Sequence, residues 1–148
     1  MAGGTSPGSI GAFTRPNNVT FDHLRIAIRN FGRQARNWTA SINSTDLSNP
    51  LTVRALNDQL MQLEKIFLVP GGVPLQNSTR HAILAYTGLD KYGQATFPGI
   101  VNLLNQFLRI PEQDRDAWAG WELLRRHVTE IYVMIVQAES HLKPHFII

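Results

Sequence analysis

The spacing of apolar residues in the C-terminal part of the chain constrains the fold most strongly. Between Asp114 and His141 they recur at steps of three and four residues, the period of a helix with one buried face, and Lys143-Pro144 ends the pattern. The stripe consists of Trp121, Leu124, Val128, Ile131, Ile135, Ala138 and Leu142. This spacing predicts a long helix over residues 114–141.

Three earlier segments have the same period. The first covers residues 21–42 with Thr20 as N-cap, the second begins at Asn49-Pro50 and ends before VPGGVP, and the third runs from about residue 97 to 109. Their expected buried stripes are Phe21, Leu24, Ile28, Phe31, Ala35, Trp38 and Ile42; Val53, Leu56, Leu60, Leu63 and Phe67; and Ile100, Leu103, Leu104 and Phe107. The fold class predicted is all-α, a four-helix bundle with a long irregular loop between the second and third helices.

That loop, residues 68–97, is rich in Gly and Pro and contains one short apolar stretch, residues 82–86, expected to be extended. Residues 1–17 are rich in Gly, Ser, Thr and Pro without any period. They predict a flexible N-terminal segment or a cloning remnant, which leaves residues 18–148 as one domain.

Composition excludes several classes of function. The 148 residues include no Cys, so disulfides, thiolate metal sites and a Cys nucleophile are absent. No apolar run approaches the roughly 20 residues of a membrane span, and residues 1–16 lack the apolar centre of a signal peptide. We therefore expect no direct membrane insertion and neither signal nor anchor in this chain.

Charge gives a weak argument for a nucleic-acid partner. The formal net charge is only +3, and the basic side chains of residues 21–42 fall well away from the apolar stripe of the same predicted helix. These side chains are Arg25, Arg29, Arg33 and Arg36. A solvated helix face explains them better than nucleic-acid binding, which would need interleaved aromatic residues.

The five histidines do not have the spacing of a metal site. His127 and Glu130 share a helical face without any Glu-x-x-His pair, and Pro144 separates His141 from His145. With His23 and His81, they are expected to be surface or capping residues. Motifs for a nucleophilic serine or a phosphate-binding loop are also absent, so the sequence predicts no catalytic residues, no metal ligands and no cofactor in this chain.

The segment IYVMIVQA, residues 131–138, is apolar nearly all round. Such a helix is buried on more than one side, either at the centre of its own bundle or against another subunit or domain.

Four Asn-x-Ser/Thr triplets are candidate N-glycosylation sites, with Asn18, Asn37, Asn43 and Asn77 as acceptors. Chance would give about one such triplet in a chain of this composition, so four is a mild excess. Some or all of them are incidental on the simpler interpretation.

Several segments together resemble the C-terminal domain of the glutamate carboxypeptidase II and transferrin receptor family. The most specific are Asn57-Asp58-Gln59-Leu60, Arg80-His81 and Phe97-Pro98-Gly99-Ile100, at similar intervals. The resemblance implies a transferrin receptor-like dimerisation domain over residues 18–148, part of a longer chain that also holds a zinc peptidase domain of the M28 type. The zinc ligands and general base would lie in that peptidase domain, so this chain alone is not expected to be an enzyme.

The resemblance also implies partners and a substrate-binding role. It implies a homodimer and contact with the peptidase domain of the same parent chain, with no nucleic acid. Lys91 and Tyr92, within LDKYGQATFPGI, match a pair that in the peptidase branch reaches the active site and binds the substrate's C-terminal residue. Lys would bind a side-chain carboxylate and the Tyr hydroxyl the α-carboxylate. The parent would lie in the secretory pathway, membrane-anchored, vacuolar or extracellular.

Two alternatives stay open at this point. Lys91 and Tyr92 can instead be a solvated lysine and a loop anchor, and the chain can be a stand-alone helical interaction module with no peptidase domain.

Overall fold

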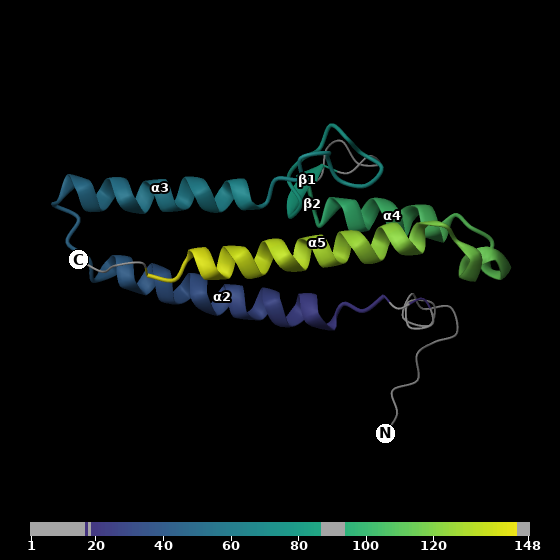
Figure 1. Ribbon diagram of the computed structural model, residues 1–148, viewed down its shortest axis with the longest axis horizontal. Helices are drawn as coiled ribbons and strands as arrows, with labels where there is room; N and C mark the ends of the chain where they lie inside the picture. The colour runs from purple at the N-terminus through teal and green to yellow at the C-terminus, as the bar shows by residue number, and fades with distance from the viewer. Residues whose placement is uncertain (1–16, 18, 87–93, 145–148) are drawn as a thin grey trace, which may run out of the picture.

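The computed structural model describes residue 17 and residues 19–86 and 94–144, and these residues are mostly α-helical (Figure 1). The predicted all-α class is confirmed. Helix α5 lies between α2 on one side and α3 and α4, arranged end to end, on the other.

Helix α2 spans Asp22–Asn43, close to the predicted bounds. The predicted cap is displaced by one residue, because Phe21 occupies the N-cap position while the Thr20 hydroxyl oxygen accepts a hydrogen bond from the Asp22 amide at 3.2 Å. The predicted stripe is wrong at Ile28, which is 40% exposed, whereas Leu24 and Ala27 are buried and Phe31 packs against the core.

Helix α3 spans Pro50–Ile66 and begins as predicted. The Asn49 side chain accepts a hydrogen bond from the Leu51 amide at 3.0 Å, and Pro50 occupies the first turn, where a missing N–H costs nothing. Phe67 then ends the helix, and the chain enters a series of turns stabilised by backbone hydrogen bonds such as that from the Val69 amide to the Arg80 carbonyl, 2.8 Å.

A two-stranded antiparallel hairpin follows, formed by β1 (Leu84–Tyr86) and β2 (Gln94–Thr96). The register pairs Ala85 with Ala95, and the Phe97 amide donates to the Ile83 carbonyl at 2.8 Å just beyond the strands. The expected extended segment at residues 82–86 is thus a strand over its last three residues.

Helix α4 spans Pro98–Leu108, as predicted. It begins directly after Phe97, whose φ of 56° lies in the left-handed region that bulky residues rarely adopt. The residues between α3 and β1, 68–83, are called the turn segment. The side-chain amide of buried Asn102 donates to the Pro74 carbonyl at 3.2 Å, which fixes this segment against α4.

Helix α5 spans Gly120–His141, so its predicted start at residue 114 is wrong. A 3₁₀ helix, η1 (Glu112–Ala117), occupies that stretch, and Trp118 is extended with ψ of 122°, which interrupts helical geometry before α5. All seven residues of the predicted α5 stripe are buried.

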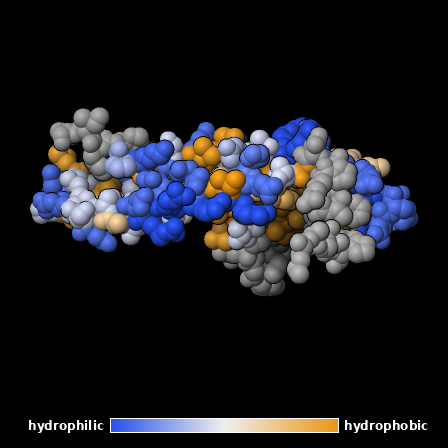
Figure 2. All heavy atoms as spheres, turned by 90° about the horizontal axis from the view of Figure 1, so that it is seen from below, coloured by the Kyte–Doolittle hydropathy of each residue, from blue (hydrophilic) through white to orange (hydrophobic). Residues whose placement is uncertain are grey.

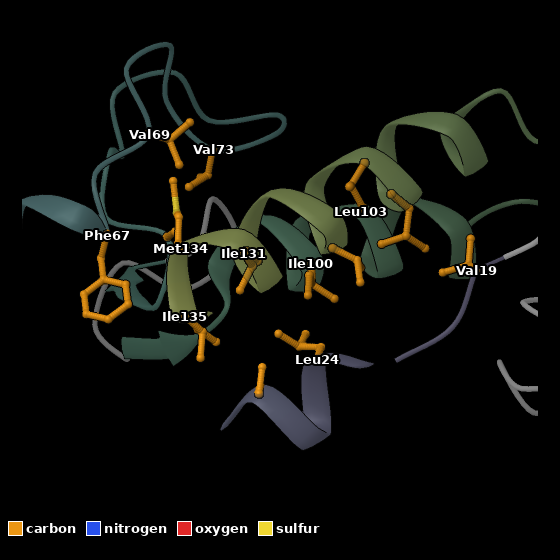
Figure 3. Close-up of a cluster of buried hydrophobic side chains, with 14 of the residues drawn as sticks. Val19, Leu24, Phe67, Val69, Val73, Ile100, Leu103, Ile131, Met134 and Ile135 are labelled. Atoms are coloured by element: carbon orange, nitrogen blue, oxygen red, sulfur yellow. The ribbon is translucent and has the colours of Figure 1, made fainter. Parts of the chain in front are cut away.

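The core forms around α5. Figure 3 shows Ile131, Met134 and Ile135 of α5 near Leu24 of α2, Ile100 of α4 and residues of the turn segment. At the other end of α5, the rings of Phe107, Trp118 and Trp121 pack at steep angles to one another, with centroids 5.1–5.4 Å apart. Figure 2 shows, from the α2 side, a mostly hydrophilic surface with a few hydrophobic residues near its middle.

Candidate functional site

Helix α3 is the least buried of the long helices. Leu56 is its only buried residue, whereas Val53 and Leu60, both predicted to be in the core, are 36% and 42% exposed. The prediction fails because a helical period shows which residues share a face but not whether a neighbour covers it. Here α3 contacts α5 while part of its apolar face stays open to solvent.

A groove of about 740 Å³ lies between the end of α3 and α5; we call it the α3/α5 groove. Its apolar lining includes Ile66, Leu68, Val133 and Met134, of which Leu68 and Val133 are 42% and 45% exposed. Its charged lining is Lys65, Glu122, Arg125, Arg126 and Glu130. Apolar residues bordered by charges are typical of a protein interface.

The apolar segment at residues 131–138 is buried on one side by its own domain and partly exposed on another. Ile131, Met134, Ile135 and Ala138 are buried inside the domain, whereas Val133 and Val136 are 45% and 39% exposed. One side of the segment therefore remains available to a partner.

Gln59 of α3 forms hydrogen bonds to both α2 and α5 near the C-terminal end of α5. Its side-chain oxygen accepts from the Trp38 indole of α2 at 2.8 Å, and its amide donates to the His141 carbonyl of α5 at 2.7 Å. His141 returns a bond from Nε2 to the Gln59 carbonyl at 2.9 Å. Gln59 lies in one of the segments that carry the family resemblance, and its hydrogen bonds link α2, α3 and α5 at this end of the domain.

His81 lies at the start of the hairpin. Its Nδ1 accepts from the amides of Ile83 and Leu84 at 3.2 and 3.1 Å, and its Nε2 lies 3.0 Å from a carboxylate oxygen of Glu64 on α3. An accepting Nδ1 has no proton, so Nε2 carries it and donates to Glu64. His81 is therefore a half-buried capping residue, as predicted.

His127 is buried, which corrects the prediction that it lies at the surface. It is 2% exposed, and its Nδ1 lies 3.0 Å from Glu130 on the same helix. Its Nε2 faces Gly99 in the first turn of α4, where any added side chain would overlap the ring, and it is the one buried side-chain polar atom among the described residues without a hydrogen-bond partner. Burial lowers the pKa of His127, and the hydrogen bond and charge of Glu130 oppose this shift.

Lys91 and Tyr92, predicted to bind substrate, lie outside the described residues. The described structure nevertheless brings the flanking residues together, because the hairpin register pairs Tyr86 with Gln94. The two ends of the segment that contains Lys91 and Tyr92 are thus side by side.

The candidate glycan acceptors and the arginines of α2 are exposed where the structure describes them, whereas His141 is partly buried and bonded to Gln59. Asn37, Asn43 and Asn77 are accessible, and Asn18 lies outside the described residues. The four arginines of α2, Arg25, Arg29, Arg33 and Arg36, are all exposed. Within residues 17, 19–86 and 94–144, no cluster of three or more His, Asp or Glu side chains could hold a metal ion. No helix in this part of the chain is long and apolar enough to cross a membrane.

A helical domain with an exposed apolar groove bordered by charges has a surface typical of an interaction module. The chain is a member of the transferrin receptor-like dimerisation domain family, whose model matches residues 19–143. The family predicted from the sequence is confirmed.

The curated relatives include proteins named as aminopeptidases and proteins named as glutamate carboxypeptidases. The chain is 30% identical over 138 residues to aminopeptidase NAALADL1 of Rattus norvegicus, covering 92% of this chain and 18% of the relative. It is 24% identical over 127 residues to the probable glutamate carboxypeptidase LAMP1 of Arabidopsis thaliana, covering 86% and 18%. The chain thus spans about a fifth of the length of these relatives.

Proposed function

We propose that this chain is the C-terminal helical dimerisation domain of a glutamate carboxypeptidase-like zinc peptidase, and that its Lys91-Tyr92 segment completes the substrate pocket of that parent enzyme. The family match over residues 19–143 carries the proposal. The chain itself is not the catalyst, and the zinc belongs to the parent's peptidase domain.

The α3/α5 groove supports the dimerisation part of the proposal. Exposed apolar side chains on α3 and α5 lie beside charges of both signs, and a second copy of the chain can supply both an apolar face and opposite charges. The homodimer and the contact with the parent's own peptidase domain are the partners proposed.

The chemistry of Lys and Tyr supports the pocket-completing part. An ammonium group binds a glutamate side chain through charge, and a phenol hydroxyl donates a hydrogen bond to the α-carboxylate that every C-terminal residue carries. In the sequence the pair lies between β1 and β2, and the antiparallel pairing of these two strands supports the proposal because it brings the flanking residues Tyr86 and Gln94 together.

The test is kinetic and uses the full-length parent with a matched pair of peptides ending in Glu and in Leu. Lys91→Ala should lower kcat/KM for the Glu peptide by about ten- to a hundredfold, since a hydrogen bond to a charged group contributes roughly 1.5–3 kcal/mol. The Leu peptide should lose much less. Tyr92→Phe is the matched control, and it should slow both peptides equally because both have the α-carboxylate.

Equal losses for the two peptides on Lys91→Ala would show that Lys91 does not bind the side chain. Because some relatives are named aminopeptidases, blocked peptides with an acetylated N-terminus are included. If only unblocked peptides are cleaved, the parent acts from the N-terminus and the carboxypeptidase assignment is wrong.

We also propose that the parent passes through the secretory pathway and carries N-glycans on this domain. The exposure of Asn37, Asn43 and Asn77 supports this, because an acceptor must be accessible. Mass spectrometry of the parent from secretory cells should find a glycan at one or more of these sites or at Asn18. Unmodified asparagine at all four would contradict the proposal.

A further inference from the structure

Two histidines flank the β1–β2 hairpin. His81 precedes β1 by three residues, and His127 packs against Gly99 in the first turn of α4, which follows β2. The Phe97 amide, bonded to the Ile83 carbonyl at 2.8 Å, joins these two ends of the hairpin. Any change at either histidine therefore acts on the same short element.

His81 holds the hairpin through an unprotonated nitrogen. The amides of Ile83 and Leu84 both point at Nδ1, and a proton there would turn an acceptor into a donor facing two donors. The protonated ring would keep its contact with Glu64 on α3, the charged group that faces it, but would lose both backbone bonds. The neighbouring Phe67 ring, 5.9 Å away between centroids, offers no compensation by hydrogen bonding.

His127 also fits its site only as a neutral ring. Glu130 accepts from Nδ1, so a second proton would go to Nε2, which has no hydrogen-bond partner and lies against Gly99. Pro74 contacts the same position from the turn segment, and neither α4 nor this segment presents a charged group there. A buried N–H⁺ at the positive end of a helix dipole is unfavourable.

We propose that His81 and His127 hold the two ends of the β1–β2 hairpin only in their neutral forms, so that the hairpin is an acid-released element of this domain. The hairpin is closed near neutral pH, and it loosens as protons are taken up. The depressed pKa of His127 gives the sign of the stability change. The unfolded chain takes up the proton first as the pH falls below the ordinary value near 6.5, so the stability present above that value is progressively lost below it.

The test measures amide hydrogen exchange of the 148-residue chain at about pH 7.5 and about pH 5.0, corrected for intrinsic exchange rates. The amides of Ile83 and Leu84 should lose protection by about tenfold at the lower pH, because they bond to His81 Nδ1. The neighbouring Ala82 amide, bonded to the Phe67 carbonyl at 2.8 Å, should keep its protection and serves as the internal control.

Three variants separate the histidines. His81→Asn keeps an acceptor that cannot be protonated, since an Asn side chain bonds the amide two residues on, so protection of Ile83 should become independent of pH. In the unaltered chain, the Phe97 amide, bonded to the Ile83 carbonyl, should also lose protection at the lower pH. His127→Leu removes the buried titrating group and should preserve that protection. His23→Asn, at an exposed histidine of α2, should behave like the unaltered chain.

Unchanged protection of Ile83 and Leu84 between the two pH values would overturn the proposal. An equal loss of protection in His81→Asn and in the unaltered chain would also overturn it. The measurement needs no peptidase domain and no substrate, so its outcome is independent of the proposed function of Lys91 and Tyr92.

Discussion

Gly120, the first residue of α5, is required by the packing of the Trp118 ring against it. The ring lies over the Gly120 Cα, and a methyl group there would overlap it, whereas Trp118 is fixed by Phe107, Trp121 and a 3.3 Å hydrogen bond from its indole to Gln106. Gly32, in the middle of α2, has open space, and its nearest neighbour would be the end of the Arg36 side chain at 3.7 Å.

The two glycines should therefore respond oppositely to alanine. Gly32→Ala should stabilise the domain by up to about 1 kcal/mol through helix propensity. Gly120→Ala should destabilise it by about 1–3 kcal/mol, because overpacking outweighs any gain in propensity. Thermal unfolding measures both, with about 2–4 °C expected per kcal/mol. A rise in Tm for Gly120→Ala would show that the indole ring moves aside readily.

For single residues, the sequence predicts which side chains share a helical face better than it predicts which residues of other elements surround them. The His127–Glu130 spacing is visible in the chain and correctly places both on one helical face. The burial of His127 could not be predicted, because it depends on Gly99 and Pro74, which are distant in sequence. The position of His127 three residues after Leu124 and four before Ile131, both buried, is the one signal that pointed inward.

Among the elements, α5 is predicted best and α3 worst, for a common reason. Seven apolar residues at helical spacing give α5 a stripe that neighbours cover on several sides, so period and burial agree. In α3 the period is equally clear, but Val53 and Leu60 are exposed because neighbouring helices cover only part of the stripe. A clear helical period whose apolar face the rest of the domain leaves exposed is therefore expected for an interface helix rather than for a core helix.

Local backbone geometry accounts for the other differences between prediction and structure. The start of α5 moves from residue 114 to Gly120 because residues 112–117 form a 3₁₀ helix, whose period is close enough to 3.6 to be indistinguishable in six residues. The hairpin is recognised only as a short apolar stretch, since each strand has three residues. The periodicity within each strand does not show which residues pair across the hairpin, such as Leu84 with Thr96.

For the whole molecule, the distribution of exposed apolar residues decides where a second copy can bind. The α2 face carries the four exposed arginines and isolated apolar residues such as Ile26, 47% exposed, on a mostly hydrophilic surface (Figure 2). The α3/α5 groove instead combines apolar residues from two elements with charges of both signs. Self-association through the groove keeps the four arginines of α2 away from those of the second copy, and the basic side chains of the groove itself lie beside Glu122 and Glu130.

Val133→Glu tests this assignment, because Val133 lines the groove and is already 45% exposed, so the fold should tolerate the change. In a dimer formed through the groove, the carboxylate would replace an apolar contact and lie beside Glu130, at a cost of about 2 kcal/mol or about thirtyfold in the dimer dissociation constant. Ile26→Glu is the matched control on α2 and should leave that constant unchanged. Sedimentation equilibrium across a concentration series measures both. If Ile26→Glu weakens the dimer and Val133→Glu does not, the copies meet through α2, and the groove is left for the parent's peptidase domain.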